Sequence, residues 1–148
     1  MNEIDAAYIA GLFDGEGCVQ YKQYIETKKK HKGSGTRKTK VWRINLEMSM
    51  TDESVIRWVH EKLGVGTVNV NIKNKSPSSK PHWKKQWRWR CAHRDAYYVA
   101  RLIWPYVHVK LPKINQIIAH YSREKLKENN IVNLKEYRHA NMERKVKI

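Results

Sequence analysis

Residues 8–17, with the sequence YIAGLFDGEG, decide the fold expected for this chain. The segment is apolar around nearly the whole circumference of a helix and then ends in acid, glycine, acid, glycine. On a helical wheel, small residues and one acid share one face, and larger apolar residues share the other. The first face comprises Ala7, Ala10, Gly11 and Asp14, and the second comprises Tyr8, Ile9 and Leu12. We therefore expect this helix to pack on both sides, with a second helix close against its small face and a sharp glycine turn at its end.

The charge of the chain points to a polyanionic partner. Its 148 residues correspond in length to one domain, residues 1–148. They include 30 Lys and Arg against 14 Asp and Glu, a net charge of +16, which is unusual for an enzyme of small metabolites. No apolar run is long enough for a membrane span, and no basic amphipathic helix adjoins a lipidation signal. The sequence favours nucleic acid, held mainly through its phosphates, over a membrane or a small-molecule substrate.

The cysteines and histidines predict neither disulfides nor a structural zinc site. Cys18 and Cys91 show no pairing pattern, and the N-terminal sequence MNEIDAAY lacks the charged and then apolar build of a signal peptide. We expect an intracellular protein with free thiols, and the sequence leaves cytoplasm, nucleoid and organelle open. The seven histidines are scattered, and Cys91 and His93 are too isolated to form half of a zinc site.

Hydrophobic periodicity predicts an α+β fold in which an antiparallel sheet is covered by helices on one face. The predicted order is helix, strand, strand, helix, strand, strand, helix, followed by extra C-terminal helices. The predicted helices begin at Asn2, Thr51, Arg94 and Pro112, and they end near Gly17, Gly64, Trp104 and Glu128. The predicted strands cover residues 18–27, 41–50, 67–73 and 84–91.

The sequence also predicts two loops and a C-terminal helix. Residues 28–40, KKKHKGSGTRKTK, contain no apolar side chain and predict a long, flexible, basic hairpin loop. The many basic residues favour an arm that follows the DNA backbone over a merely solvated tip. Residues 74–82, which include two prolines, predict a second loop. Residues 129–148 predict a further helix without an assigned role.

The polar side chains that alternate along the four strands form the predicted DNA-binding face. The face is rich in Arg, Asn and Gln, whose forked groups can make bidentate hydrogen bonds to base edges in the major groove. An ordinary solvated face, which usually holds more Lys and Glu, is the alternative for any single residue. Glu26 and Glu47 either accept from cytosine or orient a neighbouring cation. The predicted residues are Gln20, Lys22, Tyr24, Glu26, Arg43, Asn45, Glu47, Asn69, Asn71, Lys73, Gln86, Arg88 and Arg90, with Arg37 and Lys38 from the basic loop.

Residues 9–17, IAGLFDGEG, resemble the signature of the LAGLIDADG homing endonucleases position by position. The resemblance implies that this helix packs against a second copy of itself and that the last acid, Glu16, binds a divalent metal at a DNA-cleaving centre. We find no second copy of the signature, so a homodimer is expected, with Ala7, Ala10, Gly11 and Asp14 at its interface. Twofold symmetry in turn implies a roughly palindromic double-stranded DNA target.

The resemblance also implies a catalytic site. Glu16, with the carbonyl of Gly15, is the expected ligand of Mg²⁺, because hard cations prefer oxygen; Mn²⁺ or Ca²⁺ can take the same site. The segment PYVHVKLPK, residues 105–113, resembles the place of the family's catalytic lysine, here Lys110. Many members carry a Gln before the second helix to position water. Here that residue is Met50, so either Ser49 substitutes or activity is reduced.

Two other functions are compatible with this resemblance. An RNA-binding intron maturase would share the fold and the basic surface without needing Glu16. A DNA-binding regulator without catalytic activity is the second alternative, and Met50 lends it some weight. The acid at Glu16 together with Lys110 favours the endonuclease, since a pure binder has no reason to place a carboxylate beside phosphates.

Overall fold

The computed structural model describes residues 1–29, 33–71 and 84–126. The predicted loop at 74–82, Lys73 and the predicted helix at 129–148 lie outside the described residues. The elements, in chain order, are α1 (Glu3–Glu16), β1 (Gly17–Lys29), β2 (Thr36–Met50), α2 (Glu53–Leu63), β3 (Thr67–Asn71), β4 (Gln86–Ala92), α3 (His93–Ile103) and α4 (Leu111–Leu126).

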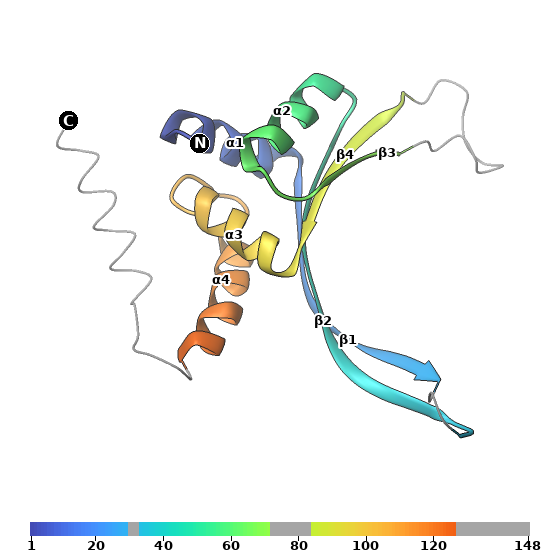
Figure 1. Ribbon diagram of the computed structural model, residues 1–148. Coiled ribbons are helices and arrows are strands. Elements are labelled where there is room, and N and C mark those ends of the chain that lie inside the picture. Colours follow the sequence, from blue (N-terminus) through green and yellow to red (C-terminus); the bar gives the residue numbers. More distant parts are fainter. Residues whose placement is uncertain (30–32, 72–83, 127–148) are drawn as a thin grey trace.

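The four strands form one antiparallel sheet in the order β1-β2-β4-β3. All four helices lie on one side of this sheet, and the other side is open (Figure 1). The predicted α+β class, the element order and the one-sided covering by helices are therefore confirmed.

The core lies between the sheet and the helices and follows the predicted alternation. Ile44, Leu46 and Met48 of β2 are buried, whereas their neighbours in the strand point to the open side. Trp89 of β4 is fully buried, and its indole nitrogen donates to the carbonyl oxygen of Val65 at 3.0 Å. Helix α4 buries a stripe at helical spacing, which consists of Ile114, Ile117, Ile118 and Tyr121.

Helix α1 is rotated relative to the predicted faces. Asn2 caps it as predicted, and its side chain accepts from the backbone nitrogen of Asp5 at 2.7 Å. However, Ala10 is 0% exposed within the single chain, whereas Tyr8 is 54% exposed. Ala10 therefore has no surface left for a dimer partner, against the prediction, whereas Tyr8, although half exposed, packs its ring edge to face with Trp58 of α2 at 5.5 Å. A helix that is apolar on all sides does not reveal from its sequence which side the sheet will cover.

Strands β1 and β2 are longer than predicted and form a ribbon that extends past the helices (Figure 1). Their pairing continues from Gly17 opposite Met48 to Lys29 opposite Thr36. The prediction of a loop over 28–40 is therefore wrong for most of that segment. Both faces of the ribbon tip are solvated, so its strands carry no apolar alternation that would identify them.

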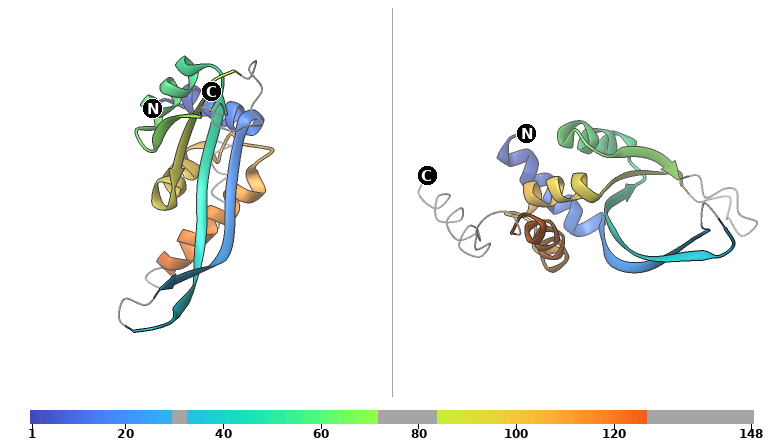
Figure 2. Two further views of the ribbon diagram at one scale, coloured as in Figure 1. Left: turned by 90° about the vertical axis from the view of Figure 1, so that its right-hand side faces the viewer. Right: turned by 60° about the horizontal axis from the view of Figure 1, so that its bottom comes forward.

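Helix α4 lies alongside the base of this ribbon (Figure 2). The rings of Tyr21 and Trp42 stack at 4.8 Å, and His120 of α4 meets both rings edge to face. This aromatic cluster joins α4 to the ribbon.

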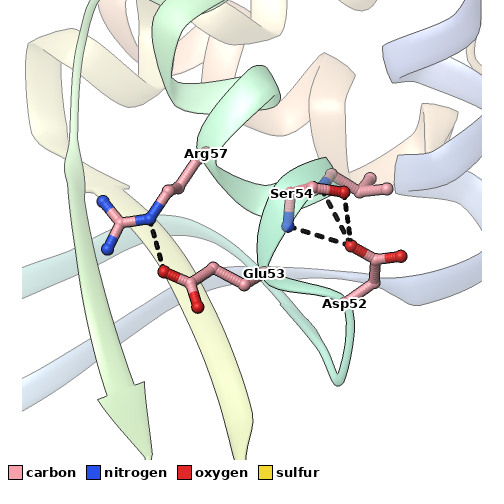
Figure 3. A network of polar contacts seen from close by, with 5 residues as sticks. Asp52, Glu53, Ser54 and Arg57 are labelled. Carbon is pink, nitrogen blue, oxygen red and sulfur yellow. Dashed lines mark hydrogen bonds and ion pairs between the residues drawn. The ribbon is translucent and has the colours of Figure 1, made fainter.

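The N-cap of helix α2 lies one residue later than predicted. Asp52, rather than Thr51, is the cap, and its carboxylate accepts from the backbone nitrogens of Ser54 and Val55 (Figure 3). Arg57 and Glu53 form an ion pair one turn apart at 2.6 Å. Gly64 ends the helix in the left-handed conformation, φ 68°. Within the described part of the chain, no helix is long and apolar enough to span a membrane.

Candidate nucleic-acid interface and cleavage site

The open side of the sheet gathers most of the side chains predicted to bind DNA. The register sets Lys22 opposite Arg43 and Asn69 opposite Arg88, and paired residues point to the same face. Of the predicted residues, this face carries Gln20, Lys22, Tyr24, Glu26, Arg37, Arg43, Asn45, Glu47, Asn69, Gln86, Arg88 and Arg90. Asn71 stands opposite Gln86 in the same register. Lys38 alternates with Arg37 and therefore points to the other face of the ribbon, against its predicted place beside Arg37.

Two contacts join neighbouring side chains within this face. Glu26 forms an ion pair with Lys28 at 3.1 Å in the free protein, and whether it accepts from cytosine on DNA stays a prediction. The guanidinium of Arg43 lies over the ring of Tyr24, with its central carbon 5.0 Å from the ring centroid. A stacked guanidinium keeps its donors directed along its own plane, where a base edge or a phosphate can accept from them.

Asn45 differs from the other polar residues on this face, because it is only 3% exposed. Its amide lies 3.3 Å from Gln20 Oε1 on β1. In the amide orientation that satisfies its neighbours, its oxygen accepts from Arg90 Nη2 at 2.6 Å. Asn45 therefore contacts Gln20 and Arg90 and leaves little surface for a base, so we expect it to act on DNA through these two neighbours.

Glu16 lies where the helical layer meets the open face. It is the last residue of α1, its side chain is exposed, and Gly17 immediately begins β1. The last turn of α1 contains no basic residue, so the negative end of the helix dipole is left for an external cation. The last carbonyl groups of any helix lack helical partners, and Gly15 belongs to this last turn.

These residues fit a magnesium ion shared with a substrate rather than one enclosed by protein. No group of three or more His, Cys, Asp or Glu side chains is placed to hold a metal among the residues that the structure describes. Magnesium is commonly held by one or two carboxylates together with substrate phosphates. One exposed carboxylate per chain at a helix C-terminus meets that requirement once phosphate oxygens complete the shell.

Ser49 and Met50 lie on opposite sides of the end of β2. Met50 is partly buried and packs against the core on the helical side. Ser49 points to the open face, where it stands opposite Arg88. Methionine at position 50 is therefore explained by packing, and Ser49 presents a hydroxyl at the open face near the end of β2.

Asp14 is engaged within its own chain. Its two carboxylate oxygens accept from the backbone nitrogens of His108 at 2.7 Å and Lys110 at 2.9 Å. Burial raises the pKa of Asp14, but hydrogen bonds from the backbone of His108, Lys110 and Val109 outweigh it and hold the pKa below its usual value. Asp14 thus contacts the segment before α4 within its own chain, and its expected place at a dimer interface stays a prediction.

Cys18 also lies on the open face, although it is not among the residues predicted to bind DNA. It is exposed on the open face, two residues after Glu16, and it stands opposite Glu47. The strand alternation that places Gln20 and Lys22 on this face also places Cys18 there, so the signal was present. Cys91 is buried, and burial, reinforced by the charge of Asp95, raises the pKa of its thiol to about 12.

No protein-family sequence model matches the chain, and no curated protein sequence matches it with significance. Solved structures do match it. The homing endonuclease I-CvuI, in complex with the I-CreI target and magnesium, gives a TM-score of 0.56 at 17% identity and covers 80% of this chain and 68% of that one. I-CvuI with its own target in calcium gives 0.54 at 15% identity, covering 79% of this chain and 65% of that one.

Two further structures give a similar match over more of the chain. The group I intron-encoded homing endonuclease I-CeuI, complexed with DNA, gives 0.54 at 14% identity, with 86% of this chain and 59% of that one covered. The LAGLIDADG meganuclease I-AabMI, bound to uncleaved DNA, gives 0.51 at 16% identity, with 87% of this chain and 38% of that one covered. The chain thus spans roughly two thirds or less of these relatives, and at such identities the likeness establishes the fold.

Proposed function

We propose that this chain, whose fold is that of the LAGLIDADG homing endonucleases, is a single-motif member of that family. It acts as a homodimer that hydrolyses both strands of a long, roughly palindromic DNA target with a divalent metal. The observation that carries this proposal is the exposed Glu16 at the end of α1, beside an open sheet face in a chain of net charge +16.

The open face supports duplex DNA as the substrate. A two-stranded ribbon matches the width of the major groove, and β1 and β2 form such a ribbon. Its outward side chains combine Lys22 and Arg37, suited to phosphates, with Gln20 and Arg43, which can hydrogen-bond to bases. Residues 1–148 then act as one domain that both binds and cleaves.

Phosphodiester hydrolysis requires a polarised water and stabilisation of the charge that gathers on the phosphate oxygens. Glu16, with the Gly15 carbonyl, would hold the divalent ion, which when bound supplies charge stabilisation and lowers the pKa of water. Lys110 would face the scissile phosphate as a cation. Ser49 would orient the attacking water with its hydroxyl.

A homodimer would form along the exposed stripe of α1, which consists of Ile4, Ala7, Tyr8 and Gly11. Ile4 is 80% exposed, and a Cβ added at Gly11 would meet nothing within 4 Å in the single chain. A partner helix can therefore approach closely at Gly11 without crowding the monomer. Two chains would supply two Glu16 carboxylates, one for each DNA strand.

The proposal is tested by selecting bound duplexes from a randomised DNA library and incubating them with Mg²⁺ or with EDTA. We expect one roughly palindromic sequence to be enriched and both of its strands to be cut only when Mg²⁺ is present. Selection of RNA over DNA in a parallel library would support the maturase instead. Selected DNA that stays intact in both Mg²⁺ and Mn²⁺ would support the regulator.

A further inference from the structure

Asp14 joins two segments that lie far apart in the sequence. Its carboxylate, in the last turn of α1, receives the backbone N–H groups of His108 and Lys110, which are 94 and 96 residues later. The two bonds use different carboxylate oxygens, so one side chain fixes two points of the segment that leads into α4.

Lys110 is held on both sides of its Cα. Its N–H group donates to Asp14 Oδ1, and its carbonyl oxygen accepts from the backbone nitrogens of Lys113 and Ile114 in the first turn of α4. The backbone of Lys110 is therefore anchored to α1 in one direction and to α4 in the other. The position of its Cα, from which the side chain extends, is therefore fixed by backbone hydrogen bonds on both sides.

The contact also suits the charge of the carboxylate. Asp14 lies at the N-terminal end of α4, where the helix dipole is positive and backbone N–H groups lack helical acceptors. An asparagine in its place would offer one oxygen acceptor and one N–H₂ donor, so one of the two backbone N–H groups would lose its acceptor and face another donor.

Asp14 and Glu16 belong to the same turn of α1. We propose that Asp14 is a positioning residue, which holds Lys110 in a fixed relation to Glu16 by fastening the His108–Lys110 backbone to the end of the helix that carries Glu16. This inference rests on the proposed function, because it assigns Asp14 a role only if Lys110 acts in cleavage.

The test is a double-mutant cycle of Asp14→Asn and Lys110→Ala. Single-turnover cleavage of the selected target, DNA affinity and thermal stability are measured for all four proteins. We expect Asp14→Asn to slow cleavage by at least about tenfold, since small misplacements of catalytic groups are costly, while affinity changes less than about twofold. In the Lys110→Ala background Asp14→Asn should slow cleavage no further, although thermal stability should fall equally in both backgrounds.

Asp52→Asn is the matched control, because Asp52 also accepts two backbone N–H groups at a helix N-terminus. It removes the same charge but keeps its acceptor, because both N–H groups donate to one Asp52 oxygen, so it should cleave at the wild-type rate with little loss of thermal stability. Should Asp14→Asn fail to fold, Asp14→Glu, which keeps the charge but displaces the carboxylate, replaces it in the same cycle.

The inference would be overturned if the cleavage rate of the double variant fell by the product of the two single-variant losses. It would also be overturned if Lys110→Ala cleaved at the wild-type rate. Failure of the proposed function is recognised separately, as the absence of metal-dependent cleavage in the wild-type protein itself.

Discussion

Asn45 on β2 stands directly opposite Gln20 on β1, and its side-chain amide lies 3.3 Å from Gln20 Oε1. This pair divides the polar residues of the open face into two kinds. Some present free hydrogen-bonding groups to a ligand, and others are occupied in holding their neighbours. Asn45, nearly without exposed surface, is of the second kind.

Asn45→Ala should therefore change DNA specificity without the loss of a direct contact. Removing the amide frees Gln20 and Arg90, so discrimination should relax at the base pairs that these two side chains read. Binding to a complete set of single-base target variants measures this. Arg90→Ala and Gln20→Ala serve as controls, and relaxed positions that match neither control would contradict the assignment.

Arg88→Ala should cost about 1–3 kcal/mol at particular base pairs if Arg88 makes a bidentate base contact. Lys22→Ala, on the same face, should instead weaken binding evenly across sequences. It should also reduce the slope of log affinity against log salt concentration by about one. Affinity for target variants at several salt concentrations separates the two. An even loss for Arg88→Ala would identify it as a phosphate contact.

Gly11→Leu should weaken the dimer while leaving the monomer intact. The added side chain meets open space in the single chain and replaces a glycine that costs a helix about 1 kcal/mol. At a tight helix pair the same side chain should cost about 1–3 kcal/mol by overpacking. Sedimentation equilibrium and thermal unfolding measure the two effects.

Two other variants serve as controls for Gly11→Leu. Gln116→Leu places a leucine on the exposed side of α4 and should leave association unchanged. Gly17→Ala should destabilise the monomer, because a Cβ there lies 2.6 Å from the Phe13 ring. Unchanged association of Gly11→Leu would place the dimer interface elsewhere.

One thiol of the native protein should react with a maleimide at pH 8. Cys18 is exposed, whereas Cys91 is buried with its pKa raised to about 12, so only a small fraction of Cys91 is ionised at that pH. Bound target DNA should protect Cys18, which lies on the open face. Mass spectrometry of Cys18→Ser checks the identity of the reactive thiol, and full labelling in the presence of saturating DNA would place the duplex away from this part of the sheet.

The strands and helices of the core could be predicted because burial imposes a period on them. Residues 41–50 alternate clearly, and the stripe from Ile114 to Tyr121 repeats at helical spacing. The ribbon tip could not be predicted, because both of its faces meet solvent and no burial is imposed. The rotation of α1 could not be predicted either, since Tyr8 and Ala10 are both acceptable inside a protein.

The candidate site was predictable where it is local. The acid and glycine pattern of residues 14–17 marks the end of α1, and strand alternation places Arg43 and Arg88 on one face. The contact of Asp14 with Lys110 was not predictable, because it depends on how α1 and α4 meet in three dimensions. The same holds for Asn45, whose burial is caused by side chains from two neighbouring strands.

The most direct test of the central claim compares Glu16→Gln with the wild-type protein on the selected duplex. Cleavage in Mg²⁺ and affinity in its absence are measured together, with Glu61→Gln, an exposed acid on α2, as the control for the change in charge. We predict that Glu16→Gln binds the duplex at least as tightly as wild type and leaves both strands intact, whereas Glu61→Gln cuts normally. Cleavage by Glu16→Gln at the wild-type rate would contradict the account.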